Sequence, residues 1–331
     1  MPSGLLIRLR PVGPWRIGPD SGDRDRVDRI YHSDSLYSAV TSAMSRLDLL
    51  DTWLEATARA SEPAVRFSSC FPYQGDTLLV VPPRNLWPPP PSSKVRWKGA
   101  RFVPLSVVES LAAGKGLSED GWTIDGPSEC LLPFSSPAPT GPFRVSVRSS
   151  AAIDREGASV AAHSTACLEF TPGSGLWCAC HFLDSAAQER WTKPLTAALR
   201  LLCDSGFGGK RSQGWGRSEM PEISEGMVDV HANTDGNHAY WLLSLFHPAE
   251  SDSVEWSQGN YTLTTRGGRV ESDARWGDRK KQTRMVSEGS VVVASSEPRG
   301  SAADVAPDGF PHPVYRAGFA LAVSIPLRMA S

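Results

Sequence analysis

Gly206-Phe-Gly-Gly-Lys-Arg-Ser-Gln-Gly-Trp-Gly-Arg217 is the stretch of sequence that decides the fold. Five of its residues are glycines, which reach positive φ without a Cβ clash, so successive backbone N–H groups can turn toward an anion. Lys210, Arg211 and Arg217 supply the matching positive charge, and Ser212 and Gln213 add polar groups. The segment therefore predicts an anion-binding loop.

The elements on either side of this loop indicate which anion it binds. Apolar residues recur before it at helical spacing, at Trp191, Leu195, Ala198, Leu199 and Leu202. They predict a helix that runs to Asp204, with Gly206 at the left-handed C-cap, and a strand-like run follows the loop. Phosphate loops of nucleotide-binding folds have the opposite order, strand before and helix after. With Trp215 as a stacking ring, this order favours single-stranded RNA; the simpler alternative is a glycine-rich turn with solvated charges.

Composition limits the remaining possibilities. The chain has 331 residues, 40% hydrophobic and 21% charged, which fits a globular protein with room for two domains. A net charge of −2 excludes a protein that coats RNA with its whole surface, so any RNA site is a local patch. The six cysteines are scattered without a C-x-x-C pair, so we expect no metal site and a reduced, cytoplasmic chain. We expect no signal peptide, no membrane span and no cofactor other than RNA.

The first half of the sequence follows the order of a ferredoxin-like domain with insertions. Strands are predicted at residues 4–9, 65–71, 78–81, 144–148, 167–170 and 176–183, and helices from Ser33 or Asp34 to about residue 59 and at residues 106–113. One insertion, about 82–101, is proline-rich and then basic; we interpret Lys94 to Arg101 as a strand with Lys94 and Lys98 on one face. Its Trp87 and Trp97 are predicted to be exposed anchors for protein partners. The other, about 144–183, is a hairpin or thumb, in which the small-residue tract 158–166 is interpreted as a loop.

The second half of the sequence is richer in strands. A polar stretch at residues 229–237 places the domain boundary between 232 and 233, giving domains 1–232 and 233–331. Strands are predicted at 240–246, 261–265, 290–294 and 319–325, so the fold class is α+β with a more β-rich second domain. A basic run with Lys280 and Lys281 and an aromatic turn with Tyr315 and Arg316 are weaker candidates for RNA or partner contacts, because such runs are usually solvated.

His32 precedes the first predicted helix and allows two interpretations. A histidine there can transfer a proton in RNA cleavage or hydrogen-bond to nearby backbone. No second His, Lys or Tyr is tied to His32 by local spacing. We therefore predict that His32 is not catalytic.

Four segments of the sequence resemble a known family. The segment from Gly206 to Arg217 resembles the glycine-rich loop of the RAMP superfamily of CRISPR proteins. His32-Ser33-Asp34 with the helix that follows, Asp154-Arg155, and His312 to Gly318 extend the resemblance along the chain. Their order is similar to that of one RAMP group, the subunits counted fourth in type III-A Csm effectors.

The resemblance implies two ferredoxin-like (RRM-like) RAMP domains and a non-catalytic RNA-binding subunit of an antiviral ribonucleoprotein. Such a subunit caps the crRNA 5′ tag and contacts the large polymerase-like subunit and the backbone RAMP subunits, with the target RNA nearby. The RNA-binding residues that it implies are Gly208, Gly209, Lys210, Arg211, Ser212, Gln213, Trp215, Arg217, His32, Ser33, Asp34 and Arg155.

Two other functions use the same scaffold. A metal-independent RAMP endoribonuclease that processes crRNA would use His32 as general acid or base, with Lys210 or Arg211 stabilising the phosphorane. A pure assembly subunit would keep the fold without needing the charges of the loop.

Overall fold

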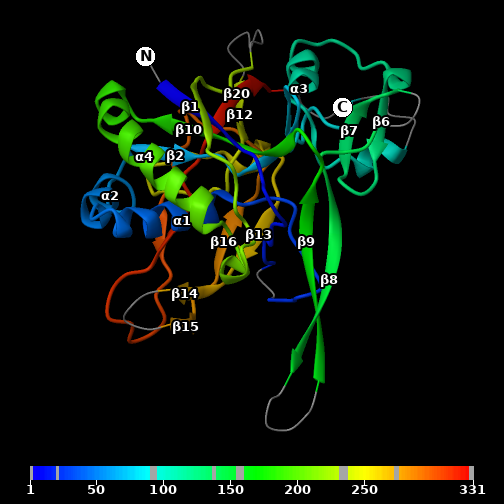
Figure 1. Ribbon diagram of the computed structural model, residues 1–331. Coiled ribbons are helices and arrows are strands. Elements are labelled where there is room, and N and C mark those ends of the chain that lie inside the picture. The colour runs from blue at the N-terminus through cyan, green and yellow to red at the C-terminus, as the bar shows by residue number, and fades with distance from the viewer. Residues whose placement is uncertain are drawn as a thin grey trace.

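The computed structural model describes residues 3–19, 22–89, 95–135, 139–153, 160–230, 238–271 and 276–327. A central sheet with helices on one face forms the N-terminal half, and several small sheets form the C-terminal half (Figure 1). The predicted mixture of helices and strands is confirmed. The predicted domain boundary lies outside the described residues.

The central sheet is antiparallel, and its described strands run in the order β11-β1-β10-β3-β4-β5, with β2 also paired to β10. Sequence periodicity located most of these strands, because alternating apolar residues mark a strand with one buried face. The bounds are β1 (Ser3–Leu9), β2 (Val65–Phe67), β3 (Phe71–Gln74), β4 (Thr77–Val80), β5 (Val103–Pro104), β10 (Ser174–Phe182) and β11 (Glu222–Glu225).

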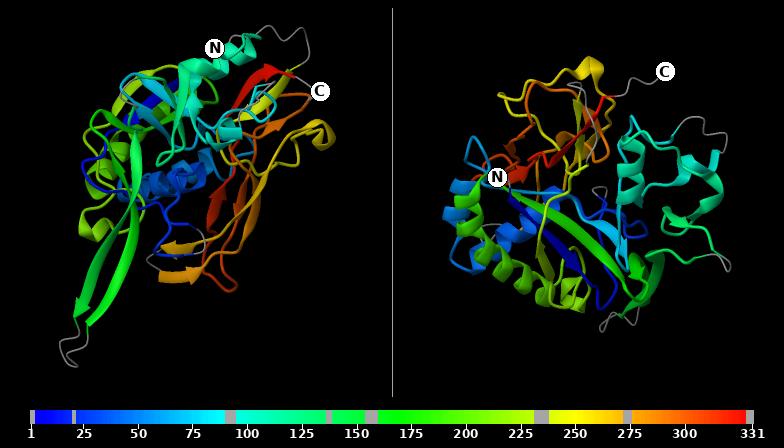
Figure 2. Two further views of the ribbon diagram at one scale, coloured as in Figure 1. Left: turned by 90° about the vertical axis from the view of Figure 1, so that its right-hand side faces the viewer. Right: turned by 90° about the horizontal axis from the view of Figure 1, so that it is seen from above.

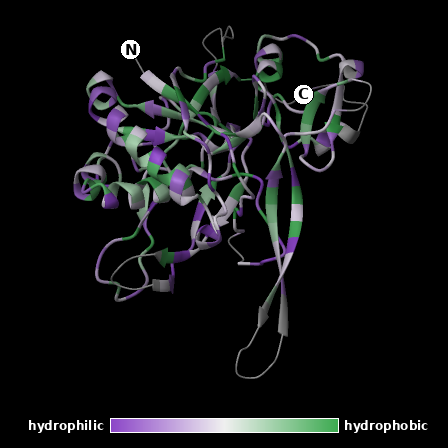
Figure 3. Cartoon of the chain, in the orientation of Figure 1, coloured by the Kyte–Doolittle hydropathy of each residue, from purple (hydrophilic) through white to green (hydrophobic). Residues whose placement is uncertain are grey.

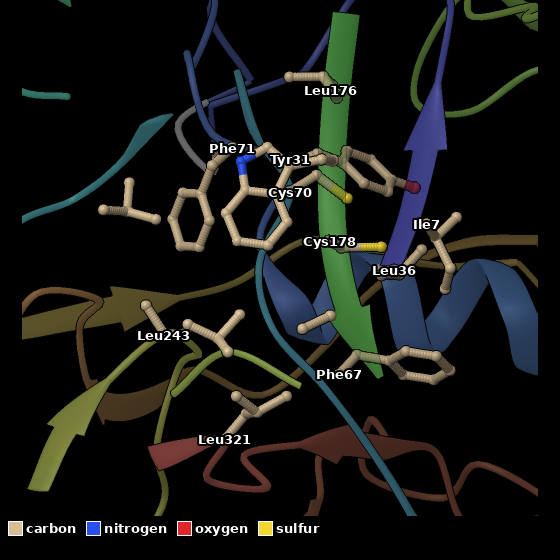
Figure 4. Packing of buried hydrophobic residues seen from close by; sticks show 14 of the residues in the cluster. Ile7, Tyr31, Leu36, Phe67, Cys70, Phe71, Leu176, Cys178, Leu243 and Leu321 are labelled. Carbon is tan, nitrogen blue, oxygen red and sulfur yellow. The ribbon is translucent and has the colours of Figure 1, made fainter. Parts of the chain in front are cut away.

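Three helices cover one face of this sheet: α1 (Ser33–Arg46), α2 (Leu50–Ala56) and α4 (Ser185–Ser205). The prediction of one continuous helix as far as residue 59 is wrong, because α1 ends at Arg46 and α2 begins at Leu50. Side chains from β1, α1 and β10 meet in the core, among them Ile7, Leu36 and Cys178 (Figure 4). Figure 3 shows apolar residues concentrated along the central strands. All six cysteines are buried free thiols.

A long hairpin projects from the body of the protein (Figures 1 and 2). It consists of β8 (Phe143–Ile153) and β9 (Val160–Phe170), which pair without a break from Phe143↔Phe170 to Ile153↔Val160. The interpretation of tract 158–166 as a loop is wrong from Val160 onward. The small residues from Val160 onward pair with β8 through backbone hydrogen bonds. Because this ribbon projects from the body and encloses no core, it needs no large side chains. Arg155, in the turn, lies outside the described residues.

The insertion before the hairpin forms a small unit beside the central sheet (Figure 1). It contains α3 (Leu105–Ala112), β6 (Trp122–Asp125), β7 (Cys130–Pro133) and the 3₁₀ helices η1 (Val95–Gly99) and η2 (Glu119–Gly121). The predicted basic strand is thus wrong, because residues 95–99 form η1. Trp97 is buried and meets the half-buried Trp87 edge to face, with ring centroids 5.8 Å apart. Two tryptophans expected to anchor partners instead pack together inside the chain.

In the C-terminal half, the described residues form strands and a short 3₁₀ helix but no α-helix, which confirms the β-rich prediction. A three-stranded sheet has the order β17-β12-β20, and two-stranded pairs surround it. The bounds are β12 (His238–Leu242), η4 (Trp256–Gln258), β13 (Leu263–Arg266), β14 (Arg269–Glu271), β15 (Trp276–Arg279), β16 (Thr283–Val286), β17 (Val291–Val292), β18 (Ala302–Asp304), β19 (Tyr315–Ala317) and β20 (Ala322–Pro326).

A buried ionic cluster joins the two halves at the start of α1. The Asp34 carboxylate accepts hydrogen bonds from Arg266 of β13, at 3.0 and 3.1 Å, and from Arg316 of β19. All three side chains are buried. Beside them, His32 Nδ1 lies 2.7 Å from Glu288 Oε1, and its Nε2 lies 3.0 Å from Asp28 Oδ2. We call these six residues the junction cluster.

Removing one partner from this cluster leaves the others charged in a dry interior. We predict that Asp34→Ala, which leaves Arg266 and Arg316 uncompensated, lowers the free energy of unfolding by about 3–5 kcal/mol. Glu55→Ala is the control, because it breaks the solvent-exposed pair with Arg59 and costs below about 1 kcal/mol. Urea denaturation of both variants measures the difference; equal losses would contradict a central role for Asp34.

The cluster also makes stability depend on pH. Burial alone would lower the pKa of His32, but the Glu288 charge and the hydrogen bonds with Asp28 and Glu288 raise it to about 10. Because this is above the unfolded value of about 6.5, the protonated histidine stabilises the fold fully below pH ~6.5. This contribution is lost as pH rises toward about 10. We expect the stability of His32→Gln to fall less than that of the wild type across this window in denaturation series.

Candidate nucleic-acid interface

The glycine-rich loop begins where α4 ends, as the sequence predicted. Gly206, with φ 91°, donates its N–H to the Leu202 carbonyl, and Phe207 N–H bonds to the Gly216 carbonyl at 3.0 Å. A Cβ on Gly206 would lie 2.5 Å from the Trp215 carbonyl oxygen. One on Gly216, where φ is 79°, would collide with the Phe207 carbonyl. Glycine at both positions lets the two ends of the loop cross in close contact.

The outer part of the loop presents its charges to solvent. Lys210 is half-buried in the left-handed conformation, and the short 3₁₀ helix η3 (Arg211–Gln213) follows it. Arg211, Ser212, Gln213 and Arg217 are exposed. Cations held on a backbone with so little freedom are suited to phosphate oxygens.

Buried aromatic rings pack against the inner side of the glycine-rich loop. Phe207 is buried and stacks on Trp15 with ring centroids 5.1 Å apart, and it meets Tyr31 edge to face. The Gly209 N–H donates to the Arg16 carbonyl at 2.9 Å. The buried Arg16 guanidinium donates to carbonyls of residues 23, 24, 26 and 166, so it is a structural residue.

The hairpin adds two arginines to the loop that the sequence reasoning missed. The Arg148 guanidinium lies 6.0 Å from the centre of the half-buried Trp215 ring. Arg144 and Arg148 both bind Glu169, at 3.0 and 2.8 Å, and hydrogen bonds from Arg148 and Ser146 lower the pKa of Glu169 to about 2. Two cations on one carboxylate leave a net positive charge. The alternation in Arg144-Val-Ser-Val-Arg148, which predicted the strand, already placed both on one face.

A cavity of about 690 Å³ opens beside these arginines. It lies between the loop at residues 11–14 and the base of the hairpin. Its lining includes Arg144, Arg148, Glu169 and the apolar Phe143 and Phe170. Trp215, the two arginines and this cavity thus form one continuous region of mixed charged and aromatic character.

The structure corrects the prediction that His32, Ser33 and Asp34 touch RNA. All three are buried. His32 and Asp34 belong to the junction cluster, and the Ser33 hydroxyl accepts the Leu245 N–H at 3.0 Å. His32 is also the N-cap of α1, in place of the expected Ser33 or Asp34. These residues support the interface from inside, because the neighbouring Tyr31 packs on Phe207 of the loop.

The weaker candidates are dispersed. Arg316 is buried in the junction cluster, so its predicted contact with RNA or a partner is wrong. Lys98 is exposed on η1, Tyr315 is half-buried, and Lys281 pairs with Asp308 at 2.8 Å. Lys280, which follows β15, is half-buried. Lys94 lies outside the described residues.

No metal centre is found in the described part of the chain, where no three His, Cys, Asp or Glu side chains are grouped to hold an ion. None of the helices described is long and apolar enough to cross a membrane.

Comparison with known proteins supports the family resemblance. The model of the CRISPR Csm4 C-terminal domain family matches residues 235–325. A curated protein of Thermococcus onnurineus (strain NA1), described as "CRISPR system Cms protein Csm4", is 27% identical over 333 residues, covering 98% of this chain and 99% of its own. These two matches support a type III-A Csm4 RAMP subunit.

Solved structures show the same fold. A chain in the crystal structure of a Csm3-Csm4 subcomplex of the type III-A interference complex matches with a TM-score of 0.66 and 15% identity, over 98% of this chain and 100% of that chain. A chain in a Csm1-Csm4 cassette in complex with cA4 matches with a TM-score of 0.61 and 17% identity, over 99% and 100%.

The crossing of the loop ends gives a matched pair of variants. Gly214 has the same φ of 79° as Gly216, but a Cβ there meets nothing within 4 Å. We predict that Gly214→Ala costs about 1–2 kcal/mol for its left-handed backbone, whereas Gly216→Ala adds a backbone collision and costs about 3 kcal/mol or more. Chemical denaturation checks the ranking. A Gly216→Ala loss no larger than that of Gly214→Ala would show that the loop ends do not pack this closely.

Proposed function

We propose that this chain is the non-catalytic crRNA-binding subunit of a type III-A interference complex. It holds the 5′ tag of the crRNA and joins the large polymerase-like subunit to the backbone RAMP subunits, in antiviral defence. Relatives of the same fold occur in a Csm1-Csm4 cassette and a Csm3-Csm4 subcomplex. The observation that carries the proposal is the rigid basic loop beside Trp215 and the hairpin arginines.

Each part of this surface suits one part of an RNA strand. Lys210, Arg211 and Arg217 contact phosphates, Trp215 offers a face on which a base stacks, and Arg148 supports the ring from the hairpin side. The chain as a whole carries a net charge of −2, so attraction of RNA depends on this local patch.

The finer fold assignment is part of the proposal. In the N-terminal half, β1, α1, β2–β3, β10, α4 and β11 follow one another in the βαββαβ order of a ferredoxin-like domain. The strand order β11-β1-β10-β3 is consistent with that assignment. We assign the C-terminal half to a second, more β-rich domain of the same kind, with the boundary between residues 232 and 233.

The absence of catalysis rests on His32. A general acid or base must come within hydrogen-bond reach of the RNA, but His32 is buried between Asp28 and Glu288. The endoribonuclease alternative is therefore not favoured. The proposed subunit works in the cytoplasm with RNA as its bound nucleic acid and no other cofactor.

RNA binding by the loop is tested by reversing its charges. We predict that the double variant Lys210→Glu, Arg211→Glu binds a single-stranded 5′-tag RNA about tenfold more weakly at ~0.15 M salt. The slope of log affinity against log salt falls by about 1.4, because each single-strand phosphate contact contributes about 0.7. Fluorescence anisotropy across a salt titration, on the reconstituted complex, measures both quantities.

The matched control reverses two charges of the same kind elsewhere. Lys193 and Arg200 are exposed on α4. Lys193→Glu, Arg200→Glu changes the net charge equally, so long-range repulsion affects both variants alike. An equal loss of affinity in the control, or an unchanged loop variant, would contradict a direct phosphate contact.

The absence of nuclease activity is tested with the uncleaved precursor. We predict that the wild-type chain leaves a CRISPR repeat RNA intact in EDTA, because His32 is buried between Asp28 and Glu288 and cannot reach the RNA. Denaturing gels over several hours follow the substrate. Cleavage by the wild type that is lost in His32→Gln would support the endoribonuclease instead.

A further inference from the structure

The cavity at the base of the hairpin has one wall that is bonded to the glycine-rich loop. Residues 11–14 form this wall and face the hairpin. The Val12 N–H donates to the Arg217 carbonyl at 3.1 Å, and the Gly216 N–H donates to the Pro14 carbonyl at 2.9 Å. The cavity is therefore continuous with the last residues of the loop.

Much of the cavity wall is apolar. Val12 is 58% exposed and Phe170 is half-buried, so both present apolar surface to an entering group. Four prolines add to this surface: Pro11, Pro14, Pro127 and Pro172. The volume of about 690 Å³ lies within the ~300–1,000 Å³ that is typical of small-molecule sites. The cavity is therefore large enough and apolar enough for a flat heterocyclic ring.

The charged side chains of the described lining balance one another. They are the cations Arg144 and Arg148 and the acids Asp125 and Glu169. Glu169 binds both arginines, and the Asp125 carboxylate accepts the Ser128 N–H at 3.0 Å and the Ser128 hydroxyl at 2.6 Å. A cavity whose charges cancel attracts a phosphate weakly, but it admits a neutral ring.

The two arginines still provide hydrogen-bond donors for such a ring. Each guanidinium has five N–H groups, and Glu169 accepts from the Nε and Nη2 groups of both. Their Nη1 groups can donate to ring nitrogens and carbonyl oxygens, which are the acceptors on nucleobase edges. Arg148 also lies 6.0 Å from the centre of the Trp215 ring, so the cavity adjoins the ring proposed to stack on RNA.

We propose that this cavity is a pocket for one unstacked nucleobase of the bound RNA. The inference rests on the proposed function, which supplies the RNA strand. The base enters between Val12 and Phe170, and Arg144 and Arg148 donate hydrogen bonds to its edge. The phosphates stay outside the cavity, on the loop. Because the pocket binds a base and the loop binds the backbone, the two sites can be tested separately.

Abasic RNA separates these two contacts, because it lacks one base but keeps every phosphate. A set of 5′-tag RNAs, each abasic at one position, is titrated onto the reconstituted complex and followed by fluorescence anisotropy. At one position, loss of the base weakens binding to the wild type about tenfold, within the range for a base stacked on protein. The slope of log affinity against log salt stays unchanged, because no phosphate contact is removed.

Filling the cavity removes this sensitivity. Val12→Trp fills it from an exposed position and keeps the backbone hydrogen bond of residue 12. The variant binds intact tag RNA about tenfold more weakly, and the abasic change at the sensitive position then costs nothing further. Thr140→Trp, at an exposed residue of the same lining, gives the same pattern. Leu263→Trp is the control, since this residue is 54% exposed and lies outside the lining; it keeps wild-type affinity.

Thermal melting confirms that each variant is folded. Abasic losses that are equal in the wild type and in both filled variants, or a tag without any sensitive position, overturn the inference and leave the proposed function intact. If Val12→Trp weakens binding of a purified partner subunit without RNA, the cavity holds a protein side chain, and the inference is overturned as well. A wild type that does not bind tag RNA argues instead against the proposed function.

Discussion

The pairing of one carboxylate with two guanidinium groups at the start of α1 constrains the whole molecule. Asp34 comes from the first helix, whereas Arg266 and Arg316 lie 232 and 282 residues further along the chain. Burying any one of these charges without its partners costs free energy. Each of the three side chains is therefore stable in the interior only when the other two are also in place. The two halves of the chain must therefore fold together as one structure.

This constraint reaches the RNA interface through a short path. Tyr31 precedes His32 in the chain and packs on Phe207, which holds the base of the glycine-rich loop. The loop also bonds to the segment at Arg16, and that segment pairs with β9 of the hairpin. The loop and the hairpin thus both contact the segment around Arg16. Tyr31, next to His32, connects the loop to the junction cluster and so to the C-terminal half.

Much of this arrangement could be predicted from the sequence, because it depends on local periodicity. The spacing from Trp191 to Leu202 located α4, and Gly206 located its end. What failed depends on contacts distant in sequence. His32 and Asp34 looked available because Glu288, Arg266 and Arg316, which bury them, lie more than 200 residues away. The alternation from Lys94 to Arg101 suggested a strand, but Trp97 is buried against Trp87 and the backbone winds into a 3₁₀ helix. Residues 160–166 looked like a loop because their side chains are small. They form a strand nevertheless, because a ribbon that projects from the body has no core to fill with large side chains.

Arg144 and Arg148 of the hairpin already form ion pairs within the chain. Glu169 already occupies both, and with a pKa near 2 it stays ionised throughout the physiological range. Arg148 donates its Nε–H and Nη2–H groups to Glu169 at 3.2 and 2.8 Å and remains half exposed, so a phosphate that reaches it meets a guanidinium already partly neutralised by this carboxylate. The hairpin therefore offers RNA a positive charge that Glu169 has already reduced, on an arm that projects from the body beside the glycine-rich loop.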